Sequence, residues 1–237
     1  MARTARRWTV LAGALVAGAC GSGGSGAPTG PTPAPVVPVA TPAPTARYSV
    51  TFVATWDAST HPGDFPPNPH FSGLIGGTHG ASVSFWQPGG LATEGIRLMA
   101  ERGRQSPLDL EVDAAARAGT AEHLLRGGDV PSSPGSVSLE FDVSTRFPLV
   151  TLVTMVAPSP DWFVGVSGLS LLEGGAWVQE KSVELVPWDA GTDSGATYRA
   201  ADRATAPPVG IHRLEGAPVA SNGSVASMGR FVFRRIS

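Results

Sequence analysis

Short runs of β-branched and aromatic residues, separated by Pro, Gly and Asp, most restrict what this chain can fold into. Alternation is clearest at residues 136–143, where apolar residues fill every second position from Val137 to Val143. A strand with this pattern has one buried and one solvated face. We expect strands at 48–56, 81–87, 136–143, 149–157, 162–168, 177–188 and 229–236. Strands in this number, joined by turn-rich connections, predict an all-β fold, an antiparallel β-sandwich whose first strand lies beside its last.

Only residues 107–128 have a convincing helical pattern. We expect two short helices in this connection, with a break near Gly119. No internal repeat and no second set of core residues is visible, so the sequence predicts one domain over residues 47–237 and, we expect, a monomer.

The start of the chain is typical of an exported protein. Basic residues up to Arg7 precede an apolar run that is too short to span a bilayer and ends in small residues. We therefore expect a secretory signal over residues 1–20 and a location in the cell envelope or outside the cell.

Cys20 is the only cysteine, and the small residues before it resemble the bacterial lipobox, with Ala17 where the usual motif has Leu. We predict that its thiol carries a lipid, which would be the only membrane contact of the protein. The alternative is ordinary cleavage after Ala19, with Cys20 incidental. Residues 21–46 are rich in Gly and Ser and then in Pro, Ala and Thr, which predicts a disordered tether.

Charge argues against nucleic acid as a partner. The formal net charge is −2, and removal of the three arginines of the leader leaves 14 basic residues against 19 acidic ones. No basic stripe remains that could follow a phosphate backbone.

Three aspartates stand where expected strands meet their connections. Asp161 directly precedes one strand, while Asp189 and Asp193 follow another in the segment "DAGTDSG". Loops at one end of a sandwich cluster, so the three carboxylates could meet, and a hard divalent cation such as Ca²⁺ would offset their repulsion. The spacing is not that of an EF-hand, since Gly191 stands at the third position. The alternative is that these side chains only bind turn amides.

Four segments together resemble the spondin domain, a module of the F-spondin family of extracellular matrix proteins. They are "TWDASTHPGDFPPNPHFSGLIGGTHG", "GGLATEGIRLMAERG", "VAPSPDWFVGVSGLSL" and "WVQEKSVELVPWDAGTDSG", in the family's order and spacing across most of residues 47–213. The resemblance implies a C2-like antiparallel β-sandwich that binds or adheres and is not an enzyme. It also implies a calcium site formed by Asp161, Asp189 and Asp193.

The sequence departs from the family in two respects. Thrombospondin-type repeats are not seen, and the family's cysteines are missing between Gly168 and Trp177. The partners of animal relatives therefore do not transfer, and the extracellular or envelope ligand stays unknown.

Histidines support a different hypothesis. His61, His70 and His79 lie within twenty residues of one another, near Asp57 and Asp64, so a zinc or iron site is conceivable. Their spacing fits no tight ligand pair, and buried histidines that hydrogen-bond loop backbone are the commoner case.

Three functions therefore stay open. The first is an exported, lipid-anchored, calcium-binding adhesion or ligand-binding module. The second is an exported metal-dependent hydrolase that uses His61, His70 and His79, although no common hydrolase or nucleotide-binding motif is present. The third is a metal-free structural protein of the envelope.

Overall fold

The computed structural model describes residues 41–237, so the expected leader, Cys20 and most of the expected tether lie outside the described residues. Two short helices and many strands make up this part. No helix in it has the length and apolar character needed to cross a bilayer. The longer strands are β1 (Thr45–Ala54), β3 (Ile75–His79), β4 (Ala121–Arg126), β5 (Gly135–Ser144), β6 (Leu149–Ala157), β7 (Trp162–Ser170), β10 (Glu180–Leu185) and β15 (Gly229–Arg235). The remaining elements are α1 (Glu94–Arg102), α2 (Leu108–Arg117), β2 (His70–Phe71), β8 (Leu172–Glu173), β9 (Ala176–Trp177), β11 (Trp188–Asp189), β12 (His212–Arg213), β13 (Ala220–Ser221) and β14 (Ser224–Val225).

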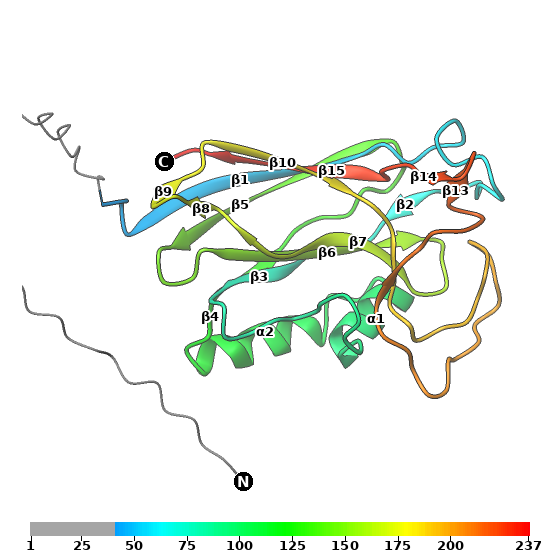
Figure 1. Ribbon diagram of the computed structural model, residues 1–237, viewed down its shortest axis with the longest axis horizontal. Coiled ribbons are helices and arrows are strands. Elements are labelled where there is room, and N and C mark those ends of the chain that lie inside the picture. The colour runs from blue at the N-terminus through cyan, green and yellow to red at the C-terminus, as the bar shows by residue number, and fades with distance from the viewer. Residues whose placement is uncertain (1–40) are drawn as a thin grey trace, which may run out of the picture. The chain divides into compact units, whose positions relative to one another are not determined.

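Two antiparallel sheets pack face to face, which confirms the predicted all-β sandwich (Figure 1). One sheet has the order β10-β15-β1-β5, and the other has the order β12-β11-β7-β6-β3-β4 with β2 beside β6. The first long strand does pair with the last, because β1 and β15 run antiparallel from Tyr48 opposite Arg235 to Ala54 opposite Gly229.

The main core lies between the sheets and follows from the alternation of the strands. On β1 the even-numbered residues from Tyr48 to Ala54 are buried, while the odd-numbered ones face outward. Aromatic rings fill much of this layer, and Phe52 meets both Phe71 and Phe231 edge-on. Such contacts favour one arrangement of the two sheets over others.

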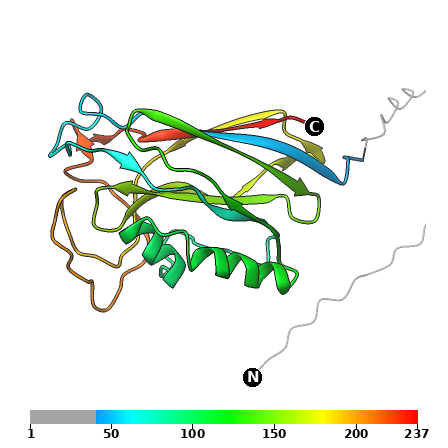
Figure 2. The same ribbon diagram turned by 180° about the vertical axis from the view of Figure 1, so that it is seen from behind.

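Both helices form a third layer on the outer face of the larger sheet, as Figure 2 shows from behind. Thr93 caps the start of α1, since its hydroxyl accepts a hydrogen bond from the amide of Ile96 at 3.2 Å. Gly77 of β3 lies directly beneath α2, and a Cβ there would stand 2.7 Å from a methyl group of Val112. A glycine at this position therefore lets the helix approach the sheet closely.

Several sequence predictions are wrong. Helix α1 lies outside the one segment expected to be helical, and the single strand expected at 177–188 is divided among β9, β10 and β11. Residues 81–87 form no strand, because Phe85 and Trp86 are buried side by side in the helix-side core, whereas a half-exposed strand buries only every second residue. Residues 121–126 form β4 and not a second helix. Leu124 packs on the helix-side core and Leu125 on the core between the sheets, so both faces of β4 are covered.

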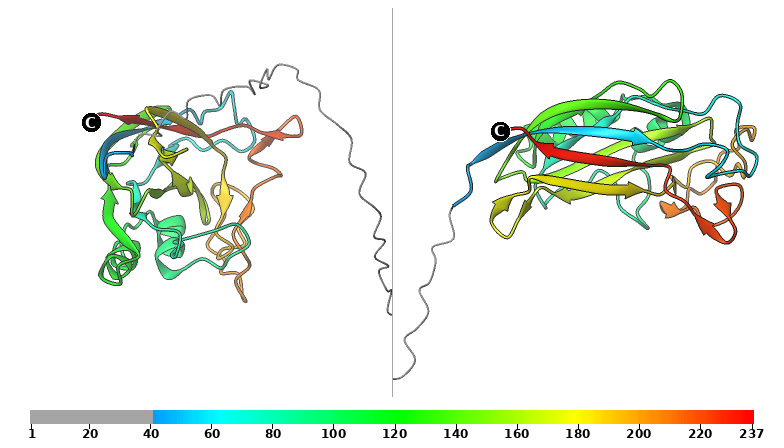
Figure 3. Two further views of the ribbon diagram at one scale, coloured as in Figure 1. Left: turned by 60° about the vertical axis from the view of Figure 1, so that its left-hand side comes forward. Right: turned by 90° about the horizontal axis from the view of Figure 1, so that it is seen from above.

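The long connections gather at one end of the sandwich. Figures 1 and 3 show the segment that follows β11 beside the C-terminal end of α1, whereas the start of β1, the β8–β9 hairpin and the C-terminus lie at the other end. This arrangement places the aspartate-bearing loop far from the residue where the domain begins.

Candidate metal centre

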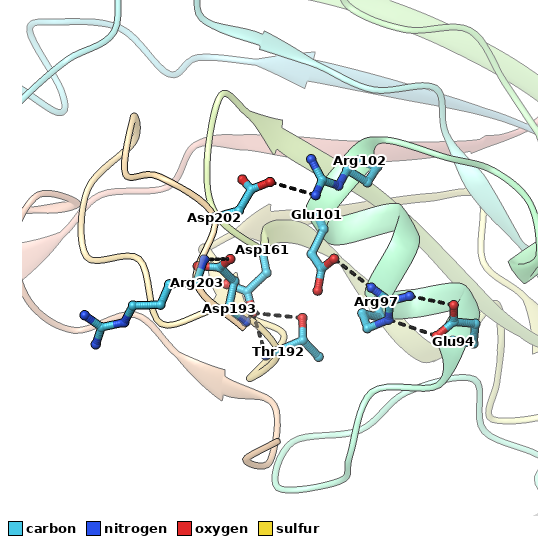
Figure 4. Close-up of polar contacts among 9 residues, drawn as sticks. All are labelled: Glu94, Arg97, Glu101, Arg102, Asp161, Thr192, Asp193, Asp202 and Arg203. Atoms are coloured by element: carbon cyan, nitrogen blue, oxygen red, sulfur yellow. Dashed lines mark hydrogen bonds and ion pairs between the residues drawn. The ribbon is translucent and has the colours of Figure 1, made fainter. Parts of the chain in front are cut away.

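Asp161 is the most deeply buried of the three aspartates. It directly precedes β7 and has no exposed surface. Its Oδ2 accepts hydrogen bonds from the amides of Thr192 and Asp193, at 2.7 and 3.0 Å, and from the Thr192 hydroxyl at 3.2 Å (Figure 4). Its Oδ1 is buried and has no hydrogen-bond partner. One oxygen thus holds the loop, and the other is left unsatisfied.

Strand pairing holds Asp189 close to Asp161. Asp189 ends β11 opposite Trp162, the residue after Asp161, and the next amide, of Ala190, donates to the carbonyl of Asp161 at 3.1 Å. The carboxylate of Asp189 accepts a hydrogen bond from the amide of Gly191 at 2.7 Å. Asp161 and Asp189, distant in sequence, are therefore adjacent at the same sheet edge.

Asp193 closes the loop. Its Oδ1 accepts from the amide of Gly195 at 2.8 Å, and its Oδ2 accepts from the amide of Arg203 at 2.7 Å. The loop can reach this position because Gly191 has a φ of 76°, and a Cβ there would stand 2.2 Å from the carbonyl oxygen of Val209.

The negative charge of the three aspartates is not balanced by nearby basic side chains, and the pKa values of two of them are raised. Burial, and then the neighbouring charge of Asp189, raise the pKa of Asp161 to about 6 despite the three hydrogen bonds that lower it. Burial also raises the pKa of Asp189, while the Gly191 amide and His212 oppose this change. Among residues 41–237, no Arg, Lys or His side chain makes an ion pair with any of the three aspartates.

The three aspartates offer the oxygen ligands that a hard cation binds, but their side chains are not arranged as a metal site. An unsatisfied buried carboxylate oxygen and two nearby carboxylates are the oxygen ligands that Ca²⁺ prefers. Within the described residues, however, no three His, Cys, Asp or Glu side chains are gathered as a metal-binding set. Each carboxylate is turned toward loop amides, as the turn alternative also expects, so binding of an ion requires the side chains of Asp189 and Asp193 to shift.

An ion pair joins the loop to α1, and sequence reasoning did not predict it. Arg102 forms an ion pair with Asp202 at 2.7 Å, and one turn earlier Arg97 bridges Glu94 and Glu101 (Figure 4). Thr192 was also missed, although it supplies two of the three hydrogen bonds to Asp161. Its place inside "DAGTDSG" was the only sign available.

The histidines do not form a common site. His70 pairs with Ala157 and His79 with Leu149 on β6, so about 26 Å of strand separates them at about 3.3 Å per residue. His61 and His79 are buried, and each has a ring nitrogen within 3.3 Å of a backbone carbonyl, of Ala226 and Gly80 respectively. The expectation of histidines that hydrogen-bond loop backbone is confirmed for both, and the hydrolase is not favoured.

Comparison with known proteins agrees with this fold. The Spondin_N family model matches residues 46–225. Spondin-2 of Rattus norvegicus is 39% identical over 173 residues, which are 71% of this chain and 52% of that protein. Spondin-1 of Rattus norvegicus is 36% identical over 208 residues, 81% of this chain and 26% of that protein. The chain thus spans about half or less of the length of these curated relatives. The match covers the larger sheet, the helices, the aspartate loop and all of the smaller sheet except β15 and the first residue of β1, and the chain belongs to the Spondin_N family.

Proposed function

We propose that the chain is an exported, lipid-anchored module that binds an extracellular or envelope ligand and is stabilised by Ca²⁺. The observation that carries the calcium part is the buried Oδ1 of Asp161, which has no hydrogen-bond partner. The carboxylates of Asp189 and Asp193 lie near it. Leaving a charged oxygen buried and unpaired is costly, and a divalent cation removes this cost.

Asp161, Asp189 and Asp193 would hold the ion, and loop carbonyls would complete the six to eight oxygens that Ca²⁺ takes. The role of the ion is structural, since it neutralises the acidic loop and fixes its shape. Thr192 and Gly191 position the loop, Thr192 through its bonds to Asp161 and Gly191 through its left-handed backbone. Binding rather than catalysis is favoured, because the histidines lie apart.

Calorimetric titration with Ca²⁺, together with melting in calcium and in chelator, tests this proposal. We expect a melting temperature that rises with calcium concentration, as mass action requires. Asp193→Asn should abolish the rise, whereas Asp129→Asn, at an exposed position outside the loop, should preserve it. No effect of calcium on the native protein would leave the metal-free structural protein as the better account.

The anchor requires its own test. The motif around Cys20 supports lipidation, and the domain begins at the sandwich end opposite the aspartate loop, so a tether at that end would display the loop outward. In a bacterial host, labelled fatty acid should be incorporated into the native chain and not into Cys20→Ser. Export of an unlabelled native chain would support simple secretion instead.

A further inference from the structure

A pocket of about 530 Å³ lies beside the aspartate loop and includes none of the three aspartates. Trp188, His212, Arg213 and Glu215 line it together with the backbone of the 88–89 turn. Its size is typical of sites for small ligands or single side chains of a partner. It is built where β11 and β12 pair, since Trp188 lies opposite Arg213.

Arg213 is held in position by aromatic stacking. Its guanidinium carbon lies 5.2 Å from the centre of the Trp188 ring. Trp188 in turn meets Trp86 at 5.2 Å between ring centres, and Trp86 packs against the buried Phe163 at 5.1 Å. The guanidinium group therefore lies over an aromatic support that is itself packed into the core, so less conformational entropy is lost when it binds a partner.

No carboxylate within residues 41–237 pairs with Arg213, although Glu215 lines the same pocket. His212 adds a second polar group, since its Nδ1 lies 3.0 Å from the carbonyl of Gly210 and its ring is exposed. A stacked arginine with free donors matches the two oxygens of a carboxylate.

Pro88 and Ile211 give the pocket an apolar part, and two exposed apolar residues lie close to its lining residues in sequence. Val209 precedes the lining residue Gly210 and is 47% exposed, and Leu91 follows the lining residue Gly89 by two positions and is 66% exposed. The two segments are joined, because the amide of Ile211 donates to Gly90 at 2.8 Å. Exposed Leu and Val at a charged pocket favour a ligand with an apolar group near its carboxylate. A sugar acid is disfavoured, because its ring would stack on the Trp188 face that Arg213 covers.

We infer that this pocket binds an acidic peptide segment of the partner, with a carboxylate on Arg213 and an adjacent apolar side chain on Leu91 and Val209. The inference rests on the proposed function in one respect: it takes the domain to be a ligand-binding module and names the class of ligand. Calcium is not required for the contact with Arg213.

A blocked tetrapeptide with one aspartate beside one leucine serves as the probe. Titration followed by nuclear magnetic resonance should shift the indole signal of Trp188. Replacement of the aspartate by asparagine in the peptide, or Arg213→Lys in the protein, should weaken binding about tenfold or more, because the paired charged hydrogen bonds are lost. Arg146→Lys is the matched control, because Arg146 also stacks on a ring, that of Phe147, but lies outside the pocket. That variant should bind normally.

Other outcomes would overturn the inference. These are equal binding by the native protein and a folded Arg213→Lys variant, equal binding of the asparagine peptide, no binding at all, or binding of free glucuronic acid as tight as that of the peptide. Asp193→Asn separates this inference from the calcium proposal, since it should lose the calcium response and keep the peptide site. Each of the two proposals can therefore fail without the other.

Discussion

At the scale of single residues, Asp161 determines how the loop behaves. One oxygen of its carboxylate anchors the loop through hydrogen bonds, while the other is buried without a partner and destabilises the ionised form. A shift from the ordinary value of 3.8 to about 6 corresponds to about 3 kcal/mol of preference for the protonated form in the folded state. That free energy is what a bound cation can recover.

Acidification should therefore increase the contribution of Asp161 to the free energy of unfolding, the opposite of what a carboxylate with a lowered pKa does. Because its pKa is raised on folding, its contribution to stability is fully present below about 3.8 and is lost as the pH rises toward 6. His61 and His79 act oppositely, since burial lowers their pKa and their contribution is lost as the pH falls below 6.5. We compare native protein with Asp161→Asn in calcium-free denaturant unfolding from pH 4 to 7, so that the histidine effects cancel. The free energy of unfolding of the native protein should fall relative to the variant as pH rises, and parallel curves would refute the role given to Asp161.

Gly191 offers a second test at this scale. Gly191→Ala places a Cβ 2.2 Å from the carbonyl oxygen of Val209 at a φ of 76°, so both steric overlap and backbone strain oppose it. Gly174→Ala is the matched control, because its φ is 57° and no atom lies within 4 Å of its Cβ. Thermal melts should show a loss of about 1 kcal/mol or less for the control and clearly more for Gly191→Ala. Equal losses would mean that the close approach to Val209 does not matter.

At the scale of secondary-structure elements, period-two alternation predicted β5 and the run of β-branched residues predicted β6. Residues 149–157 form β6 with the expected bounds, and residues 136–143 lie within β5. The pattern failed at β4, whose Leu124 and Leu125 are covered on opposite faces by helix and sheet and so imitate a helical spacing. It failed also at 81–87, where burial of Phe85 and Trp86 is decided by the helices above the sheet.

The candidate site was only partly accessible to sequence reasoning. Turn residues placed Asp161, Asp189 and Asp193 at strand ends, and the structure puts Asp161 beside both others. Periodicity carries no information on which sheet edge β11 joins or on the hydrogen bonds that Thr192 makes, because both depend on pairing between segments far apart in sequence.

The close packing of α2 on β3 can be tested by substitution of Gly77. Gly77→Ala should push the helix from the sheet, because its Cβ would stand 2.7 Å from Val112 and 3.0 Å from the carbonyl of His123. We expect a loss of about 1 to 3 kcal/mol in denaturant unfolding, the usual range for an overpacked core. Gly80→Ala, whose nearest contact is 3.6 Å, should cost clearly less. If the two variants are equally stable, α2 is not held at the distance we describe.

At the scale of the whole molecule, the sandwich and its loop end depend on different forces. Apolar side chains between the sheets hold the strands together. The 189–205 segment places one large side chain, Tyr198, in that core. Hydrogen bonds to aspartates and the ion pair of Arg102 with Asp202 add polar contacts that the rest of the sandwich does not share. Local stability differs within one fold when contacts differ in this way.

Calcium should therefore act on one end only. In hydrogen-exchange mass spectrometry, amides of residues 190–205 should exchange more slowly in calcium than in chelator, because the ion would fix the carboxylates that these amides bind. Amides of β8 and β9, at the opposite end of the sandwich, should be unchanged and serve as the internal control. Asp193→Asn should remove the difference at residues 190–205. Protection spread evenly over both ends would mean that calcium stabilises the sandwich as a unit, and the loop would then not be the separate cooperative element that its contacts indicate.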